Sequence, residues 1–362
     1  MKNLKIATVV GARPQFIKTA PVSKQLKSAG IEEILIHTGQ HFDSNMSELF
    51  FDEMKLKKPD YNLNINNLPH AALTGRIMEE LEKILLSEKP DAVLVYGDTD
   101  STLAGAITAK KLNISLIHVE AGLRSYNNSM PEEINRILTD RISDILFCPS
   151  DNAIKNLTKE GIDSRKMVQC GDVMKDALIQ FTPLMRKPDV KLPEKFILCT
   201  FHRAENINNP HKLRDLITVL ESTSEEMIPV VCPLHPHTRK KLNEYGINIS
   251  GASTNFIEPV GYLEMLYLLN HCTIVLTDSG GLQKEAFFSN KYCITLREET
   301  EWTELVENGC NFVTGCVPEK ITAAIRECLT KTFPQDGNLY GNGNASFIIV
   351  KEILSRIQKN KL

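Results

Sequence analysis

Three stretches of the chain place acidic side chains where an apolar segment ends or where a helix is expected to begin. An acid in such a position costs free energy unless it has a partner or a chemical task, and helix capping accounts for only part of this set. Grouped carboxylates favour protonation of one member, which supplies an acid and a base at neutral pH. The candidate acid/base residues are Asp98, Glu120 and one of the neighbouring pair Glu132 and Glu133.

A tight turn of small residues near position 280 is suited to binding an anion. Asp278-Ser279-Gly280-Gly281 lies between an apolar segment and a helix-like segment. Such a turn directs several backbone N–H groups and the positive end of a helix dipole at one point, which suits a diphosphate. Glu285, one to two turns into that helix, is placed to accept hydrogen bonds from ribose hydroxyls. One such turn is weak evidence by itself.

Two further strand-to-helix junctions carry cations. The sequence Gly11-Ala-Arg13-Pro follows the first apolar segment. Its glycine is explained equally well by a plain βα turn and by a ligand site. The planar guanidinium of Arg13 is suited to binding phosphate. His202 follows a later apolar segment in Thr200-Phe-His202-Arg203. The pair His235 and His237 is more simply explained as loop histidines, and with no third ligand near it does not indicate a metal site.

The elements that must position these residues alternate between strand-like and helix-like segments. Short runs rich in Val and Ile, apolar on both faces, occupy residues 5–10, 33–38, 91–96, 115–119 and 145–148, as expected for parallel strands covered by helices. Residues 180–195 hold three prolines and many charges and are predicted to be a linker, after which the alternation restarts.

This pattern predicts the α/β class, with two Rossmann-like doubly wound domains facing across a cleft. The first domain spans residues 1–180 and carries the candidate acids. The second spans residues 181–344 and carries the candidate anion turn. An amphipathic C-terminal helix within 345–362 is expected to pack back on the first domain.

Composition excludes several classes of function. The 362 residues have a formal net charge of −3, so nothing global attracts nucleic acid or an anionic membrane. No apolar run approaches 18 residues, and the first residues do not form a signal peptide, so we expect a cytoplasmic protein. Nine cysteines without a CxxC pair are expected to be buried thiols in a reducing compartment.

Taken together, the motifs resemble the non-hydrolysing UDP-N-acetylglucosamine 2-epimerase family. The similarity covers nearly the whole chain, and several motifs in the right order are far more specific than one glycine turn. The motifs are GARP at 11–14, Gln40-His41, GDTDST at 97–102, HVEAGLR at 118–124, PEEINR at 131–136, FHRAEN at 201–206, TDSGGLQKE at 277–285 and LREETEW at 296–302.

The resemblance implies a glycosyltransferase-B-like fold, a UDP-sugar substrate, no metal, no nicotinamide or other cofactor, and a homodimer formed through the first domain. At the matching positions, the resemblance implies that the acid/base carboxylates are Asp98, Glu120 and Glu132. It implies that the diphosphate is bound by Arg13, His202 and Ser279-Gly280-Gly281, and that His202 also serves catalysis. It further implies that Glu285 binds the ribose and that Met265 contacts the uracil through its backbone.

Some positions depart from the pattern of many members. Ala12 and Gln15 stand where those members carry Thr and Glu, and Trp302-Thr303 stands where they carry Arg-Pro. The segment 42–46 also differs from one linked in the family to activation by substrate at a second site, so we do not expect that regulation here. Four sequences are similar to a branch that makes the manno isomer of UDP-2,3-diacetamido-2,3-dideoxy-glucuronate for surface polysaccharide such as O-antigen: QHFDSNMS at 40–47, YGDTDSTLAG at 96–105, MPEEINR at 130–136 and ETEW at 299–302. UDP-N-acetylglucosamine stays open as the substrate.

Two other functions fit parts of the pattern. A glycosyltransferase of the same fold would use the diphosphate turn but would need an acceptor groove and has little use for three carboxylates. A nucleotide-sugar-binding regulator would bind UDP without turnover. The grouped acids together with the diphosphate turn favour the epimerase.

Overall fold

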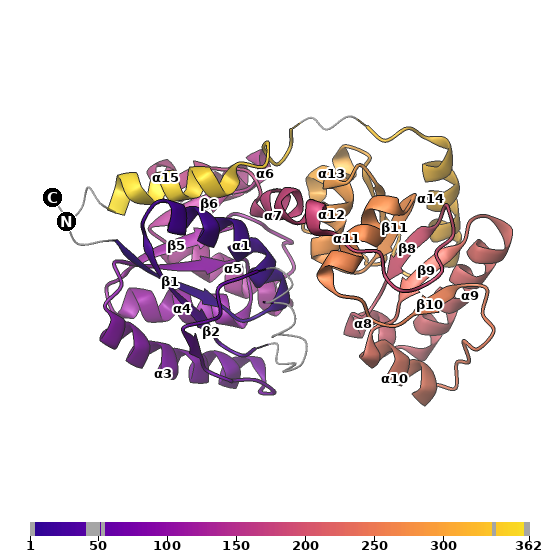
Figure 1. Ribbon diagram of the computed structural model, residues 1–362, viewed down its shortest axis with the longest axis horizontal. Coiled ribbons are helices and arrows are strands. Elements are labelled where there is room, and N and C mark those ends of the chain that lie inside the picture. Colours follow the sequence, from indigo (N-terminus) through magenta and orange to yellow (C-terminus); the bar gives the residue numbers. More distant parts are fainter. Residues whose placement is uncertain (1–3, 41–50, 52–54, 335–337, 358–362) are drawn as a thin grey trace. The chain divides into compact units, whose positions relative to one another are not determined.

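The computed structural model describes residues 4–40, 51, 55–334 and 338–357 (Figure 1). The chain divides into two compact units, and each is described by itself. Unit 1 comprises Met1–Gln180 and Asn338–Leu362, and unit 2 comprises Phe181–Gly337. Residues just after Asn338 belong to unit 1 because Tyr340 O accepts a hydrogen bond from Asp172 N, at 3.0 Å.

Unit 1 is built on a parallel sheet of seven strands in the order β3-β2-β1-β4-β5-β6-β7. Its strands are β1 (Lys5–Val10), β2 (Glu32–His37), β3 (Tyr61–Asn62), β4 (Ala92–Tyr96), β5 (Ser115–Val119), β6 (Ile145–Cys148) and β7 (Met167–Gln169). The central strand β4 is buried along its whole length, which explains why its sequence is a continuous apolar run.

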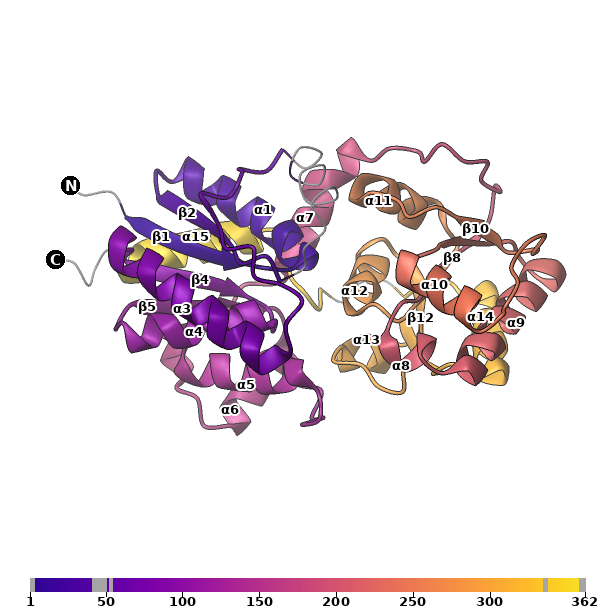
Figure 2. The same cartoon turned by 90° about the horizontal axis from the view of Figure 1, so that it is seen from below.

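Helices cover both faces of this sheet. They are α1 (Arg13–Ser28), α3 (His70–Glu88), α4 (Asp100–Lys111), α5 (Pro131–Ile142), α6 (Asp151–Lys159), α7 (Val173–Phe181) and α15 (Ala345–Ile357), with a 3-10 turn at Ser164–Lys166. Helices α1 and α15 lie side by side on one face, and α3 and α4 lie on the other (Figures 1 and 2). The carboxylate of Asp176 accepts hydrogen bonds from Ala345 N and Ser346 N, which fixes the start of α15 on unit 1.

Unit 2 repeats the plan with six parallel strands in the order β10-β9-β8-β11-β12-β13. The strands are β8 (Ile197–Thr200), β9 (Val230–Pro233), β10 (Asn255–Ile257), β11 (Ile274–Thr277), β12 (Tyr292–Thr295) and β13 (Asn311–Val313). The helices are α8 (Ala204–Ile207), α9 (Pro210–Glu226), α10 (Pro236–Glu244), α11 (Tyr262–His271), α12 (Gly280–Phe288), α13 (Thr303–Glu307) and α14 (Pro318–Thr330), with a 3-10 turn at Thr182–Leu184.

Both strand orders contain a switch point, at which neighbouring strands connect in opposite directions across the sheet. It lies between β1 and β4 in unit 1 and between β8 and β11 in unit 2. Ligands of open α/β sheets bind outside the carboxyl ends of the strands at such points. The segments that follow β1, β4, β8 and β11 are therefore the first places to look for a site.

The alternation of elements predicted from the sequence is confirmed, and the differences are at the margins. Strands β3 and β7, of two and three residues, were not predicted because edge strands so short carry little apolar signal. Helix α7 also was not predicted, and its last residues overlap the predicted linker 180–195. Some predictions concern residues that the structure does not describe. These are the helix at 46–54 apart from residue 51, the end of the C-terminal helix, His41 and the segment 42–46.

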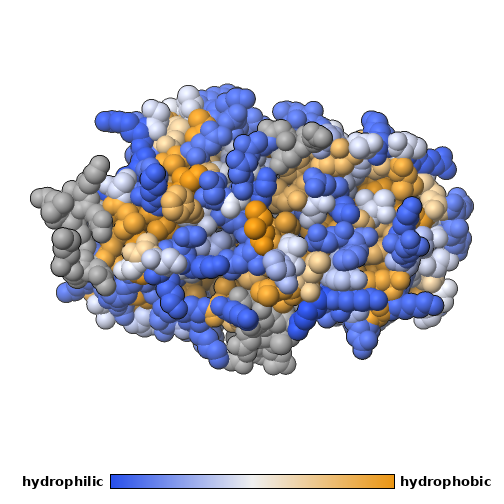
Figure 3. All heavy atoms as spheres, turned by 45° about the horizontal axis from the view of Figure 1, so that its top comes forward, coloured by the Kyte–Doolittle hydropathy of each residue, from blue (hydrophilic) through white to orange (hydrophobic). Residues whose placement is uncertain are grey.

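The burial of apolar residues follows the expected pattern. All nine cysteines are buried thiols, as predicted. On the face of the molecule in Figure 3, hydrophobic residues are scattered among polar ones. Across residues 4–40, 51, 55–334 and 338–357, no helix combines the length and the apolarity that a membrane span requires.

Candidate active site

Glu120 occupies a left-handed backbone conformation directly after β5. Its φ of +73° is uncommon for a residue with a side chain, and such strain is often found at functional sites. The N–H groups of Glu120 and Ala121 both donate to Phe147 O, at 3.1 and 3.0 Å, which holds the bend. Glu120 is buried, with 6% of the residue exposed, and its carboxylate forms an ion pair with Lys18 of α1. The bend therefore directs a buried carboxylate at a cation.

The neighbouring strand end brings Asp98 close to Glu120. Gly97, with a φ of +62°, follows β4, and a Cβ atom there would lie 3.2 Å from Glu120 Oε2. Asp98 comes next and accepts hydrogen bonds from Arg136 of α5, including one from Nε at 3.1 Å. Its side chain is 30% exposed, so it stays accessible to a ligand. Glycine at position 97 thus leaves the space in which two acids gather.

The two acids at the start of α5 have different environments. Glu133 is buried, pairs with Arg136 Nη1 at 2.9 Å and accepts hydrogen bonds from Ser125 N and Tyr126 N. Glu132 is half-buried, and its carboxylate makes no hydrogen bond or ion pair to another described residue. Glu133 is therefore structural. Glu132, four residues before Arg136 and on the same helix face, is the acid available to a ligand.

Each of the two strand-end acids has its own cation. The sequence suggested that the carboxylates would act on one another, but Lys18 compensates Glu120 and Arg136 compensates Asp98. Neither cation had been assigned a role from the sequence. Both lie inside helices, so their partners depend on tertiary packing that spacing does not reveal.

A buried network holds these strand ends in place. His118, fully buried on β5, lies 2.7 Å from Gly97 O through Nε2 and 2.7 Å from Asp140 Oδ1 through Nδ1. Asp140 also pairs with Arg124 at 2.7 Å. Burial alone would raise the pKa of Asp140, but the hydrogen bonds and charges of His118 and Arg124 outweigh burial and hold that pKa below its usual range. The network fixes Gly97 and hence the direction of Asp98.

The glycine turn at the end of β1 is filled by protein atoms. Gln15 Oε1 accepts hydrogen bonds from Gly11 N at 2.7 Å and Ala12 N at 3.0 Å, and its amide nitrogen donates to Tyr96 O at 2.8 Å. A Cβ atom on Gly11 would overlap the hydroxyl oxygens of Ser101 and Thr38. The simple explanation of this glycine as a packed βα turn is therefore sufficient. Arg13, half-buried at the first position of α1, is the part of the motif that a phosphate could contact.

In unit 2, Asp278 joins the segments that follow β8 and β11. Its fully buried carboxylate accepts hydrogen bonds from His202 N, Arg203 N and Asn206 Nδ2 at 2.9 to 3.1 Å. The His202 side chain is 45% exposed, and its Nδ1 lies 3.6 Å from Asp278 Oδ1. Asp278 is part of the turn motif, but the sequence alone assigns it no role. It holds His202 beside the start of α12.

The turn Ser279-Gly280-Gly281, hereafter the Ser279 turn, opens α12 without a capping side chain. Ser279 makes no side-chain cap, and among the described residues no side chain bonds to the N–H groups of Gly280, Gly281 or Leu282. These donors and the helix dipole are available to an anion. The carboxylate of Glu301 lies close to the turn, because a Cβ atom on Gly280 would be 2.5 Å from its Oε1. Arg297 Nη1 pairs with that carboxylate at 2.9 Å.

Glu285 and Met265 lie on neighbouring helices of unit 2. Glu285 is buried on α12 and accepts a hydrogen bond from Tyr262 Oη of α11 at 2.9 Å. Met265 is half-buried on α11, one turn after Tyr262. The bond between the two helices brings the residues predicted for ribose and uracil into one part of the unit.

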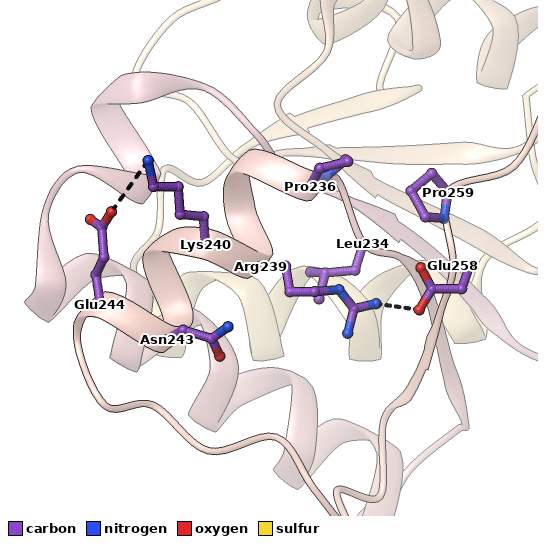
Figure 4. A pocket seen from close by; sticks show the side chains of 8 residues that line it. All are labelled: Leu234, Pro236, Arg239, Lys240, Asn243, Glu244, Glu258 and Pro259. Carbon is purple, nitrogen blue, oxygen red and sulfur yellow. Dashed lines mark hydrogen bonds and ion pairs between the residues drawn. The ribbon is translucent and has the colours of Figure 1, made fainter. Parts of the chain in front are cut away.

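A pocket of about 490 Å³ lies between α10 and the segment after β10 (Figure 4). Arg239 and Glu258, ion-paired at 2.7 Å, lie on its two sides. His235, which begins α10, stacks its ring on His202 with 5.5 Å between centroids. The pocket is lined by the residues on either side of His235 in the chain, Leu234 and Pro236, but by none of the predicted site residues. Its full lining is Leu234, Pro236, Arg239, Lys240, Asn243, Glu244, Glu258 and Pro259.

The described residues outline groups for acid/base chemistry in unit 1 and for anion binding in unit 2. Within the ranges that the structure covers, no group of three or more His, Cys, Asp or Glu side chains is arranged to hold a metal ion. The carboxylates of unit 1 are of the kind that transfers protons, and the uncapped helix start of unit 2 is of the kind that binds anions.

Comparisons with known proteins identify the family. The family model described as UDP-N-acetylglucosamine 2-epimerase matches residues 24–354. A UDP-2,3-diacetamido-2,3-dideoxy-D-glucuronate 2-epimerase of Pseudomonas aeruginosa is 50% identical over 347 residues, which cover 95% of this chain and 97% of that protein. A UDP-N-acetylglucosamine 2-epimerase of Methanococcus maripaludis is 45% identical over 359 residues, which cover 96% of this chain and 97% of that protein.

A solved structure leads to the same family. The UDP-GlcNAc 2-epimerase of Methanocaldococcus jannaschii, in complex with UDP-GlcNAc and UDP, superposes with a TM-score of 0.90 at 40% identity, covering 98% of this chain and 100% of that chain. The predicted α/β class with a glycosyltransferase-B-like fold is thereby confirmed. The chain belongs to the UDP-N-acetylglucosamine 2-epimerase family, a family of isomerases.

Proposed function

We propose that the protein is a non-hydrolysing UDP-sugar 2-epimerase that inverts C2 by eliminating UDP and adding it back. Two observations, one from each unit, carry the proposal: in unit 1, Asp98 and Glu120 follow the ends of neighbouring strands and Glu132 begins α5, and in unit 2 the helix start at the Ser279 turn is uncapped. The first group suits proton transfer at carbon, and the second suits a diphosphate.

The chemistry requires a leaving group because the C2 proton is not next to a carbonyl. As a carboxylate takes that proton, the C1–O bond to UDP breaks through an oxocarbenium-like state and leaves a glycal. A proton then returns to the opposite face of C2, and a UDP oxygen re-forms the bond at C1. The C2 configuration is inverted, and the anomeric configuration is kept.

The three acids differ in their surroundings. Asp98 and Glu120 are each held in place by a cation, Arg136 and Lys18 respectively. Glu132, which forms no ion pair with a described residue, is proposed as the third acid of the set. Protonation and deprotonation at opposite faces of C2 need at least two such groups, which this set supplies.

The leaving diphosphate gains negative charge as the C1–O bond breaks. The N–H groups of the Ser279 turn and the half-exposed His202 are fixed donors for that charge, and Arg13 of unit 1 is proposed as a further cation. Glu285 is proposed to hold the ribose, and Met265 to contact the uracil through its backbone. Water must be excluded during the glycal stage, because otherwise the enzyme would release free sugar.

We propose UDP-2,3-diacetamido-2,3-dideoxy-glucuronate as the substrate, with UDP-N-acetylglucosamine as the second candidate. The Pseudomonas aeruginosa relative, at 50% identity, is named for the first compound, and its branch is the one that the ETEW sequence at 299–302 resembles. The product would serve surface polysaccharide synthesis. A homodimer and a cytoplasmic location are also proposed, on the family resemblance alone; sedimentation equilibrium of the purified chain tests the first.

The test is proton NMR in D₂O with purified protein and each of the two sugar nucleotides in parallel. We expect a manno product with deuterium at C2 from one of them, which names the substrate. No C2 exchange from either, together with acceptor-dependent release of UDP, would contradict the epimerase and indicate the glycosyltransferase. UDP binding without any chemistry would indicate a regulator.

A further inference from the structure

The chain's only tryptophan lies against the Ser279 turn. Trp302 is 4% exposed, and its indole N–H donates to Gly280 O at 2.9 Å. Gly280 is the first residue of α12 and the middle residue of the turn. Trp302 therefore touches the backbone that is proposed to bind the diphosphate, although it lies on the separate segment before α13.

The segment that carries Trp302 is tied to α12 by further hydrogen bonds. Thr300 Oγ1 donates to Gln283 Oε1 at 2.7 Å and accepts from Trp302 N at 3.2 Å. Asn311 Nδ2 donates to the same Gln283 oxygen at 2.9 Å. The indole is thus held at a defined place relative to the helix start.

A buried lysine completes the arrangement. Lys284 is on α12, one turn after Gly280, and is fully buried, which is rare for lysine. Its ammonium nitrogen lies 4.1 Å from the centroid of the Trp302 ring, a cation–π contact. A cation over the ring withdraws electron density from the indole and so favours donation by its N–H.

The contact has a directional effect on the turn. In a trans peptide the C=O and the next N–H point in opposite directions, so a donor that fixes Gly280 O also fixes the Gly281 N–H. Hydrogen bonds in a chain polarise one another, which makes that N–H a better donor. Gly281 N–H is one of the groups without a side-chain partner among the described residues.

We propose that Trp302 and Lys284 are positioning residues for diphosphate binding. Trp302 fixes the Gly280–Gly281 peptide so that the Gly281 N–H is directed at the anion. Lys284 holds the indole of Trp302 in place. The inference rests on the proposed function in assigning the diphosphate to the Ser279 turn. Neither side chain needs to touch the substrate.

The test compares the affinities of the full-length protein for UDP and for uridine, which lacks the phosphates, by calorimetry. Trp302→Phe keeps an aromatic ring under Lys284 but removes the N–H donor. We expect about fivefold weaker binding of UDP, the size of one hydrogen bond, and unchanged binding of uridine. Lys284→Met should also lower the affinity for UDP relative to that for uridine. Lys320→Met, which removes the same charge at an exposed position, should leave this ratio unchanged.

A second measurement uses the wild-type protein and does not depend on a variant that folds. Because Trp302 is the only tryptophan, its fluorescence reports on the turn directly. We expect UDP to change the emission and uridine to leave it unchanged. The inference would be overturned if the ratio of UDP affinity to uridine affinity were the same in wild type and Trp302→Phe, or if both ligands changed the emission equally. In either case, UDP binding by the wild type would still be consistent with the proposed function. Absence of UDP binding by the wild type would overturn both.

Discussion

The two units carry the same kind of glycine-bearing turn at the same topological place, but only one turn is open to an anion. After β1, the N–H groups of Gly11 and Ala12 are bound by Gln15 Oε1, and neighbouring hydroxyls leave no room beside Gly11. After β11, no side chain of the described residues caps the first N–H groups of α12. A glycine at a switch point thus predicts a tight turn, and the neighbouring side chains decide whether it binds a ligand.

The acids and cations are also distributed differently. Unit 1 places carboxylates after the ends of β4 and β5, with Arg136 and Lys18 as their respective ion-pair partners. Unit 2 places a fully buried carboxylate, Asp278, where it accepts hydrogen bonds from backbone and amide N–H groups just before the uncapped start of α12. The same fold therefore presents ion-paired carboxylates at the strand ends of one unit and an uncapped helix start in the other, and the proposed function uses this difference.

The largest effect is expected from the acids of unit 1. Asp98→Asn or Glu132→Gln should lower turnover by about 100-fold or more, because proton transfer at C2 loses its group, while UDP affinity stays the same. Turnover and calorimetric UDP binding are measured on the same preparations.

The adjacent acid gives a matched control for that prediction. Glu133→Gln should lower the melting temperature, because Glu133 accepts hydrogen bonds from Ser125 N and Tyr126 N, whereas Glu132→Gln should not. A loss of UDP affinity as large as the loss of turnover would mean that the unit 1 acids are structural and would remove the contrast between the units.

Gln15→Ala tests whether the turn after β1 is only a packed turn. Removing the side chain leaves the Gly11 and Ala12 N–H groups without their acceptor, so we expect a loss of about 2 kcal/mol in the free energy of unfolding. UDP affinity should change less than twofold. A change in UDP affinity at unchanged stability would place an anion at this turn as well.

Arg13→Ala separates the cation of this motif from its glycine. We expect about tenfold weaker UDP binding together with lower turnover, since a guanidinium bonded to phosphate is a strong charge-assisted contact. Lys24→Ala, an exposed change on the same helix, is the control. Wild-type affinity and turnover in Arg13→Ala would remove that residue from the diphosphate site.

The smallest effect is the pH dependence of the network beneath the acids. Because the folded-state pKa of Asp140 lies below its usual range, the group contributes stability that is present above about pH 4 and is lost as pH falls through the folded pKa. The stability gap between wild type and Asp140→Asn, from urea unfolding, should therefore narrow between pH 7 and pH 3. A gap that stays constant would show that the charge of Asp140 contributes nothing.

Much of this fold can be predicted from the sequence because a parallel strand that is buried on both faces has a continuous run of apolar residues. Strand β4 is an example, with all five residues buried. The sequence predicts less where tertiary packing decides the outcome. Lys18 has apolar and small neighbours on α1, and a cation in such a helix is a signal that it has a buried partner. Only the strand order shows that the partner is Glu120.

Motifs locate the site better than they assign each residue. The acids at 98, 120 and 132 and the Ser279 turn lie at the strand ends and helix starts where they were predicted. The motif letters do not separate Glu132 from Glu133, or an open glycine turn from one filled by Gln15. Those distinctions depend on hydrogen bonds between residues far apart in the sequence, such as Gln15 and Tyr96, which are 81 positions apart.

The central claim, that UDP leaves and returns while C2 is inverted, is tested most directly by positional isotope exchange. The substrate is prepared with ¹⁸O in the bridge between C1 and the β-phosphate, and the label is followed by ³¹P NMR during epimerisation. The account predicts that ¹⁸O moves into non-bridging β-phosphate positions as deuterium enters C2. Deuterium at C2 with the label retained in the bridge would mean that the C1–O bond never breaks and would contradict the account.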